Sequence, residues 1–288
     1  MIMCYHIAMN PQHPARIRLR MLMRRSEPQL KLAEAALCIA WEDQGVANIA
    51  AALRELDGLA EAAQPRLPAG GTPRETVLAL NRFLFGELGF RGNTWDYSDP
   101  ANSFLDRVLA TRAGLPITLS VVYMEVGWRL GLPVSGVALP GHFLARYAGD
   151  GEELFIDPFN RGRLWSRAEC LTQISTFYGE AGPAIAAHVL QPPSHRAILA
   201  RMLRNLKNLY LERSEFAAAL PASERIVLLE PPQAADIRDR GMLRARLDQL
   251  NGALEDFERY ARLAPHASDL QQIKRHACAL AERAAAGN

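Results

Sequence analysis

Cysteine is scarce in this chain of 288 residues, and no two cysteines lie close together in the sequence. The four positions are Cys4, Cys38, Cys170 and Cys278, so the chain contains no CxxC pair. A disulfide framework or a thiolate zinc site needs paired cysteines, and their absence argues against both. Scattered cysteines are typical of a protein in a reducing compartment. The sequence therefore predicts a cytoplasmic protein.

Long apolar runs and a large net charge are also lacking. The longest apolar stretch in the middle of the chain, Ile117 to Val126, is too short to cross a bilayer. The formal net charge is +2, which provides no strong attraction to nucleic acid or to an anionic membrane. The seven histidines show no HxH, HxxxH or HExxH spacing. We therefore expect no nucleic acid, no membrane, no metal and no cofactor.

The start of the chain combines basic side chains with several methionines, but not in the order of a signal peptide. We interpret residues 1–25 as a disordered tail, or as the product of a start codon placed too early. A basic amphipathic membrane anchor is the alternative. Pro11 and Pro14 would keep such a helix short, which favours the first interpretation.

Residues 26–190 are predicted to form one α+β domain in which helices precede a small antiparallel sheet. Thr72 is expected to cap a helix, because Pro73 and Glu75 follow it at the positions of a helix start. The Gly-Asp-Gly turn at 149–151 separates two runs rich in β-forming residues. The other expected elements are helices over about 29–63, 104–112 and 116–131, and strands over 134–139, 143–147 and 154–157.

The C-terminal third repeats itself at an offset of 34 residues, and this period is typical of tetratricopeptide helix pairs. Small and large apolar residues recur at the positions where two helices pack, and a proline recurs at the end. We predict two pairs within residues 195–288, followed by a capping helix over about 270–286. The identical positions are Ala219 and Ala253, Leu220 and Leu254, Glu224 and Glu258, Arg225 and Arg259, Leu229 and Leu263, and Pro231 and Pro265.

His142 and Asp157 are the first candidates for a functional site. His142 stands at the start of one predicted strand and Asp157 at the end of the next, and a hairpin would bring the two side chains together. An aspartate that holds a histidine in one tautomer is the orienting half of a nucleophilic triad. The nucleophile is missing, because the helix that would carry it begins AGLPITLS and contains no cysteine at its start.

These residues resemble the transglutaminase-like superfamily, in which G-x-C opens a helix that ends near L-G-[IL]-P, and strands with His and Asp-Pro follow. The chain has Gly-Leu-Pro at 114–116, Leu-Gly-Leu-Pro at 130–133, Gly-His-Phe at 141–143 and Asp-Pro at 157–158. The strings NSFLDRVLATRAGLPITLSVVYMEVGWRLGL, PGHFLARY and FIDPFNRGRLW are similar to a SirB-type bacterial branch of largely unknown function, which carries C-terminal tetratricopeptide-like repeats.

The resemblance covers about residues 30 to 265 and implies a transglutaminase-like, or papain-like, core. It implies that His142 and Asp157 correspond to the catalytic His and Asp of the superfamily. The position of the catalytic cysteine corresponds to Pro116, which supplies no nucleophile. The site is therefore expected to be degenerate.

Two functions remain open. The first, which we favour, is a non-catalytic protein-interaction or regulatory protein whose repeat module binds a protein or peptide. The second is a hydrolase or acyltransferase that attacks with the hydroxyl of Thr118 or Ser120, with His142 as base and Asp157 as its orienting partner. The second requires one hydroxyl within hydrogen-bond reach of His142 at the floor of an open cleft.

Four more residues are candidates for binding. Asn102 either caps the next helix or lines the cleft. Trp95 and Tyr97 either form a recognition edge or fill a gap between helices and sheet. Arg146, like Arg161, either pairs with carboxylates of a ligand or lies at the surface. A separate basic cluster is interpreted as the solvated face of the first repeat helix and comprises Arg196, Arg201, Arg204 and Lys207.

Overall fold

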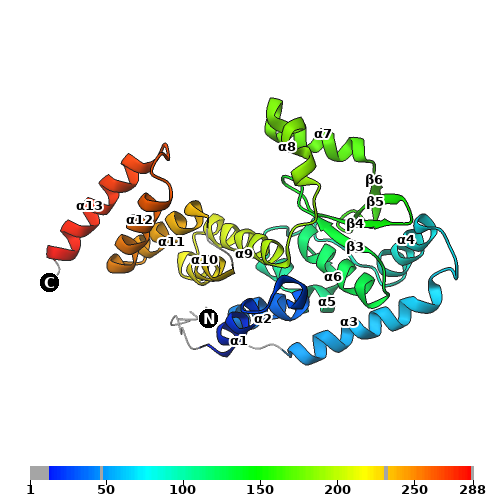
Figure 1. The fold of residues 1–288 in the computed structure, drawn as a ribbon. Coiled ribbons are helices and arrows are strands. Elements are labelled where there is room, and N and C mark those ends of the chain that lie inside the picture. Colours follow the sequence, from blue (N-terminus) through cyan, green and yellow to red (C-terminus); the bar gives the residue numbers. More distant parts are fainter. Residues whose placement is uncertain (1–12, 46–47, 230–232, 287–288) are drawn as a thin grey trace. The chain divides into compact units, whose positions relative to one another are not determined.

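The structure is a computed structural model that describes residues 13–45, 48–229 and 233–286, with the elements labelled in Figure 1. It divides into two compact units. One extends from Arg25 to Ile198, and the other combines the chain up to Arg24 with the residues from Leu199 onward. The boundary falls inside helix α9 (His195–Glu212), whose first residue is the expected start of the repeat module.

In the unit from Arg25 to Ile198, the helices expected after Thr72, over 104–112 and from Pro116 are present, whereas the stretch expected to be helical over 29–63 is divided into two helices. The capping box is present at Thr72, whose hydroxyl accepts from the backbone of Glu75 while the Glu75 carboxylate accepts in return. Helix α6 begins at Pro116 and is buried from there to Gly127, so it is the central helix of this unit. The helices are α2 (Leu32–Gln44), α3 (Ile49–Ala63), α4 (Pro73–Asn81), α5 (Leu105–Thr111), α6 (Pro116–Arg129), α7 (Arg167–Tyr178) and α8 (Gly182–Val189).

The sheet of this unit is antiparallel, with strands in the order β3-β4-β5-β6. Its strands are β3 (Val134–Val137), β4 (Leu144–Gly149), β5 (Glu152–Asp157) and β6 (Arg163–Trp165). The last strand is not expected from the sequence, and neither is the short parallel pair of β1 (Arg91–Gly92) and β2 (Ala113–Gly114). Strands as short as these show too little alternation to be recognised.

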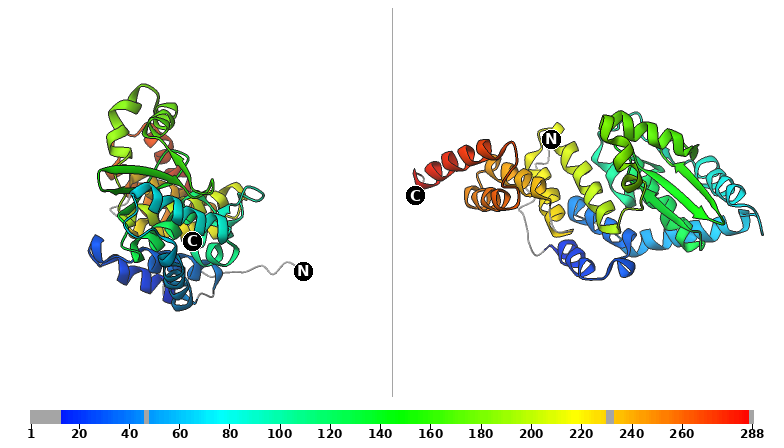
Figure 2. Two further views of the ribbon diagram at one scale, coloured as in Figure 1. Left: turned by 90° about the vertical axis from the view of Figure 1, so that its right-hand side faces the viewer. Right: turned by 45° about the horizontal axis from the view of Figure 1, so that its top comes forward.

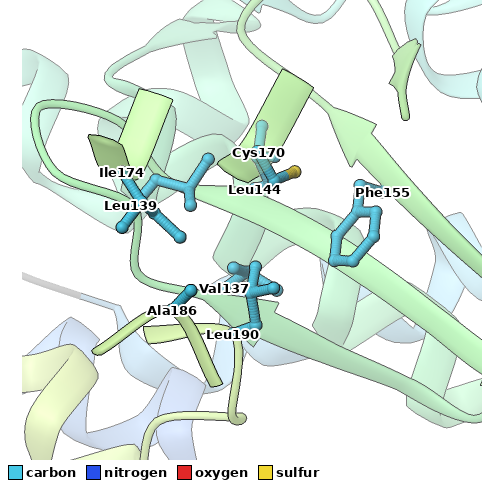
Figure 3. Packing of buried hydrophobic residues seen from close by; sticks show 8 residues of the cluster. All are labelled: Val137, Leu139, Leu144, Phe155, Cys170, Ile174, Ala186 and Leu190. Carbon is cyan, nitrogen blue, oxygen red and sulfur yellow. The ribbon is translucent and has the colours of Figure 1, made fainter. Parts of the chain in front are cut away.

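Helices cover both faces of this sheet because successive side chains of a strand point in opposite directions. Helix α6 contacts β3 and β4 from one side. Helices α7 and α8 cover the other side with a buried apolar cluster, seen from close by in Figure 3. The cluster comprises Val137, Leu139, Leu144, Phe155, Cys170, Ile174, Ala186 and Leu190.

The repeat period is confirmed in the second unit. Helix α10 (Phe216–Leu229) and helix α12 (Leu250–Leu263) are offset from each other by the predicted period at both ends (250 − 216 and 263 − 229). They are the second helices of two pairs whose first helices are α9 and α11 (Ala234–Arg246), and α13 (Leu270–Ala286) follows. Figure 2 shows these helices succeeding one another from yellow to red. Pro231, the proline expected after α10, lies outside the described residues.

The disordered tail predicted for residues 1–25 is wrong for residues 14–23, which form helix α1 (Pro14–Met23). Ala15, Leu19 and Leu22 recur at helical spacing and are buried, so this short segment has an apolar face despite its basic composition. Arg16 is buried as well and pairs with Glu224 of α10 at 2.8 Å. Residues 1–12 lie outside the described residues.

The basic cluster on α9 is not a solvated face. Arg204 donates two hydrogen bonds to Asp236 of α11, at 3.0 and 2.6 Å. The side chain of Lys207 is 5% exposed, and its ammonium group lies 2.6 Å from Asp239 of α11. The prediction failed because the acids that pair with these cations come from the next helix pair, nearly one repeat later in the chain.

Candidate functional site

The structure brings His142 and Asp157 together. Nε2 of His142 lies 2.8 Å from Oδ2 of Asp157. The antiparallel register that pairs Ala145 of β4 with Ile156 of β5 carries the start of one strand to the end of the other. The carboxyl group is fully buried, and 15% of the histidine side chain is exposed.

Asp157 is held by more donors than the histidine alone. Asn160 donates from its side chain to Oδ2 at 2.8 Å and from its backbone to Oδ1 at 3.1 Å, and Trp165 Nε1 donates at 3.2 Å. Burial raises the pKa of Asp157, but the hydrogen bonds from His142 and Asn160 outweigh burial, so its pKa lies below the usual value. The carboxylate therefore stays ionised at neutral pH.

Aromatic rings enclose the imidazole. The ring of His142 stacks on Trp165, with centroids 5.8 Å apart and planes 18° apart, and meets the edge of Phe159 at 6.3 Å. Analysis of individual residues in the sequence missed Asn160, Trp165 and Phe159 as members of this site. All three lie in the string FIDPFNRGRLW, whose resemblance to the family is a signal for the segment but gives no role to these residues.

Two contacts indicate that the start of α6 lies near this pair. The hydroxyl of Ser120 donates to the carbonyl of Phe143, the residue after His142, at 3.3 Å. Pro116 lies one turn before Ser120 on the same face of α6. From the other side, the carbonyl of Phe159 accepts from Gly92, and Gly92 pairs with Gly114, two residues before Pro116. Pro116 is buried at this position.

The hydroxyls of Thr118 and Ser120 are fully buried and engaged with the backbone. Thr118 donates to the carbonyl of Asn102 at 2.7 Å and also lies 3.1 Å from the carbonyl of Leu115. Ser120 makes the bond to Phe143 described above. Neither hydroxyl lies at the floor of an open cleft, which is the geometry that nucleophilic attack requires.

Asn102 organises a loop and does not cap the following helix. The residue at the N-cap of α5 is Phe104. The Asn102 amide donates to the carbonyl of Asp96 at 2.7 Å and accepts from Asn93 at 2.9 Å, while 3% of the residue is exposed. These bonds fix the loop over residues 93–99 that carries the aromatic candidates.

Trp95 and Tyr97 both lie in that loop. Trp95 is 98% exposed, so it does not fill a gap between helices and sheet. Tyr97 is half exposed and meets the edge of Phe159, with centroids 6.0 Å apart. Tyr97 is thus connected to the imidazole through Phe159.

Arg146 is separate from this group. Its guanidinium pairs with Glu153 of β5 at 3.1 Å and donates to the carbonyl of Leu190 at 3.4 Å. A cavity of about 350 Å³ lies beside the loop instead, lined by Arg91, Gly92, Thr94, Trp95, Phe159, Asn160 and Arg161. In the described ranges, no group of three or more His, Cys, Asp or Glu side chains is placed to hold a metal ion.

Over the part of the chain that the structure describes, no helix is both long enough and apolar enough to cross a membrane.

Two family models match the chain. The transglutaminase-like superfamily model matches residues 50–204, and a tetratricopeptide repeat model matches residues 206–277. A UPF0162 protein of Xylella fastidiosa strain Temecula1 is 40% identical over 69% of this chain and 72% of its own length. A UPF0162 protein of Pseudomonas aeruginosa is 34% identical over 79% of this chain and 83% of its own length.

A solved structure also aligns with the chain. It is a crystal structure of menin that reveals the binding site for the Mixed Lineage Leukemia protein. The alignment covers 90% of this chain and 72% of that one, with 12% identity and a TM-score of 0.39. A likeness at this level bears on neither the site nor the function.

Proposed function

This chain belongs to the transglutaminase-like superfamily and, within it, to the UPF0162 family, and we propose that it is a non-catalytic protein-interaction or regulatory protein. The observation that carries the proposal is Pro116. This residue stands at the buried start of α6, where the superfamily has its cysteine, while His142 and Asp157 remain hydrogen-bonded to each other. An acid-base pair without a nucleophile has little chemistry to perform.

The retained pair of His142 and Asp157 has a structural role, which explains why both residues are present in a protein without the catalytic cysteine. Asp157 accepts hydrogen bonds from His142, Asn160 and Trp165 and so ties together β4, β6 and the turn after β5. Loss of the cysteine leaves these bonds intact. We therefore propose that the pair holds these strands and this turn in place.

The alternative function, a hydrolase or acyltransferase that uses a hydroxyl, gains no support from the site. Thr118 and Ser120 are buried and donate to backbone carbonyls. Activation by His142 would require one of them to break that bond and turn into a cleft. We therefore keep the binding function as the proposal.

Binding is proposed to involve the first helices of the repeat pairs. Arg204–Asp236, Lys207–Asp239 and Arg238–Asp269 form a ladder of ion pairs that joins α9, α11 and the residue preceding α13. Such cross-links hold neighbouring helices in register and favour a continuous surface for a peptide or helix. Met242, one turn after Arg238 on α11, is 39% exposed beside this ladder.

A photo-crosslinking residue placed in the full-length chain in bacterial cells tests the proposal. Position 242 on α11 is expected to give a discrete adduct with a protein partner, and the matched position 258 on α12, whose side chain is 73% exposed, is not. The adduct at 242 should persist in His142→Ala, since binding does not require the acid-base pair. No adduct at 242, or equal adducts at both positions, would contradict the proposal.

A further inference from the structure

The cavity beside the loop over residues 93–99 has an unbalanced charge. Among its lining residues are two arginines, Arg91 and Arg161, and no acid. The Arg91 guanidinium donates to the carbonyl of Gly89 at 3.3 Å. Neither guanidinium pairs with a carboxylate from the described part of the chain, where most other arginines of this unit have one. The loop's own acids, Asp96 and Asp99, do not line the cavity.

The backbone that carries these arginines is fixed by the same bonds that build the candidate site. Arg161 follows Asn160 in the turn that Asp157 caps, and it has a positive φ of 55°, a conformation uncommon for a residue with a side chain. The turn closes with a 2.8 Å bond from Gly162 to the Asp157 carbonyl. The position of Arg161 is therefore imposed by the folded turn.

Arg91 is held against the same turn. Gly92 donates to the carbonyl of Phe159 at 3.0 Å. A Cβ atom on Gly92 would lie 2.5 Å from the Phe159 ring, so only glycine allows this close approach. The two arginines therefore belong to backbone segments that are bonded directly to each other.

The geometry points to a carboxylate-binding pocket in the transglutaminase-like region, one that recognises a peptide carrying a carboxylate next to an aromatic side chain. The carboxylate binds between Arg91 and Arg161, and the aromatic side chain packs on Trp95. This inference rests on the proposed function, in that it takes the transglutaminase-like region to be non-catalytic, and it adds a binding site to the one proposed on the repeat helices.

Two physical properties of the pocket support a ligand of this kind. Guanidinium groups bind carboxylates through paired, charge-assisted hydrogen bonds, which makes arginine the preferred residue for recognising them. The indole of Trp95 is 98% exposed, and an exposed tryptophan next to such a pocket is typical of a binding hot spot. A carboxylate alone would leave this surface uncovered, whereas a neighbouring aromatic group would cover it.

Three short peptides test the inference on the full-length protein. Ac-Gly-Glu-Phe-Gly-NH₂ offers a side-chain carboxylate, and Ac-Gly-Gly-Phe with a free C-terminus offers a terminal one. Ac-Gly-Gln-Phe-Gly-NH₂ is the neutral match. Binding is followed by NMR through the indole N–H signals of the four tryptophans, with the Trp95 signal assigned by Trp95→Phe.

At least one carboxylate peptide is expected to shift the Trp95 signal in a saturable manner, and the neutral peptide is expected to bind about tenfold more weakly or not at all. The responses to the two carboxylate peptides show whether the pocket recognises a side-chain carboxylate or a C-terminal one. Added salt should weaken binding, since the charges are accessible to solvent.

Arg161→Gln and Arg91→Gln should each weaken binding of the responding peptide about tenfold. Arg74→Gln is the control, because Arg74 is exposed on α4 and does not line the cavity. Equal binding of the neutral peptide, unchanged binding in both pocket variants, or no shift with any peptide would overturn the inference. The cross-linking at position 242 does not depend on this pocket, so the proposed function can stand when the inference fails.

Discussion

Asp157 shows how a single buried residue connects several parts of the site. Its Oδ2 atom accepts from the side chains of His142, Asn160 and Trp165, which come from the segment just before β4, the turn after β5 and β6. A buried carboxylate is unfavourable unless donors surround it, and here they do. The same residue also positions the turn that carries Arg161.

Replacing Asp157 with Asn should therefore lower the free energy of unfolding by about 2–4 kcal/mol at pH 7. The Asn side chain cannot satisfy all of the donors that now point at a carboxylate. Urea denaturation measures the loss. Asp150→Asn, at an exposed turn, is the control and should change stability by less than about 0.5 kcal/mol. An equal effect of both substitutions would contradict the structural role.

The effect of this substitution should also depend on pH. Because the pKa of Asp157 is lowered in the folded state, its ionised form stabilises the fold above the unfolded carboxyl pKa of about 3.9. This contribution is lost as the pH falls through the lower pKa of the folded state. The difference in the free energy of unfolding between wild type and Asp157→Asn should thus become smaller below about pH 4. A difference that stays constant down to about pH 3 would contradict the lowered pKa of Asp157.

Pro116→Cys tests whether the retained pair still faces the missing nucleophile. A thiol at a helix start next to a histidine has a lowered pKa, so it should react with iodoacetamide at pH 6 at least about tenfold faster than an ordinary exposed thiol. Mass spectrometry compares residue 116 with Cys278, which is exposed. Burial raises the pKa of Cys170 to about 12, so Cys170 should not compete.

Adding His142→Ala to Pro116→Cys should remove most of this advantage, because the imidazole no longer supports the thiolate. A thiol at 116 that reacts like Cys278 with or without the histidine would show that the helix start and the pair do not share a site. The interpretation of Pro116 as a lost catalytic position would then fail.

Among the elements, α10 and α12 illustrate the difference between repeated sequence and repeated environment. The two helices occupy matching ranges, offset by one repeat period. Glu224 of α10 is nevertheless buried, while the side chain of the matching Glu258 of α12 is 73% exposed. The difference arises because α1 packs on α10 and supplies Arg16 as a partner for Glu224.

Arg16→Ala should destabilise this unit by about 2 kcal/mol, because it leaves the buried Glu224 with a weaker partner. Arg244 remains 3.5 Å from Glu224, which limits the loss. Arg20→Ala on the same helix is the matched control, since Arg20 is exposed and its removal should cost less than about 0.5 kcal/mol. Thermal unfolding of both variants provides the comparison, and equal melting temperatures would refute the role of the pair.

Across the whole molecule, the chain forms two compact units, and one of them joins the start of the chain to its last third. Hydrogen exchange should reflect this division, because local openings follow cooperative units. Arg16→Ala is expected to raise exchange in α1 and α10 more than in α6 and β5. Asp157→Asn should do the reverse. Equal increases along the entire chain in both variants would indicate a single cooperative unit.

Much of the fold follows from signals that can be read within the sequence. The Thr72 capping box and the start of α6 at Pro116 depend on neighbouring residues, the repeat period is visible when the chain is compared with itself, and the structure contains all three. The hairpin signal at 149–151 likewise anticipated the pairing that brings His142 to Asp157.

Other features depend on partners that are distant in sequence, and they emerge only when the chain folds. Helix α1 is ordered by a face that packs on α10, in the last third of the chain, and no local pattern shows that partner. The cations of α9 look solvated in the sequence because the acids that pair with them belong to α11. Arg91 and Arg161 line one cavity only because Gly92 binds the turn that Asp157 holds. Contacts between segments so distant in sequence form only when the chain folds, because neither segment alone contains the information about its partner.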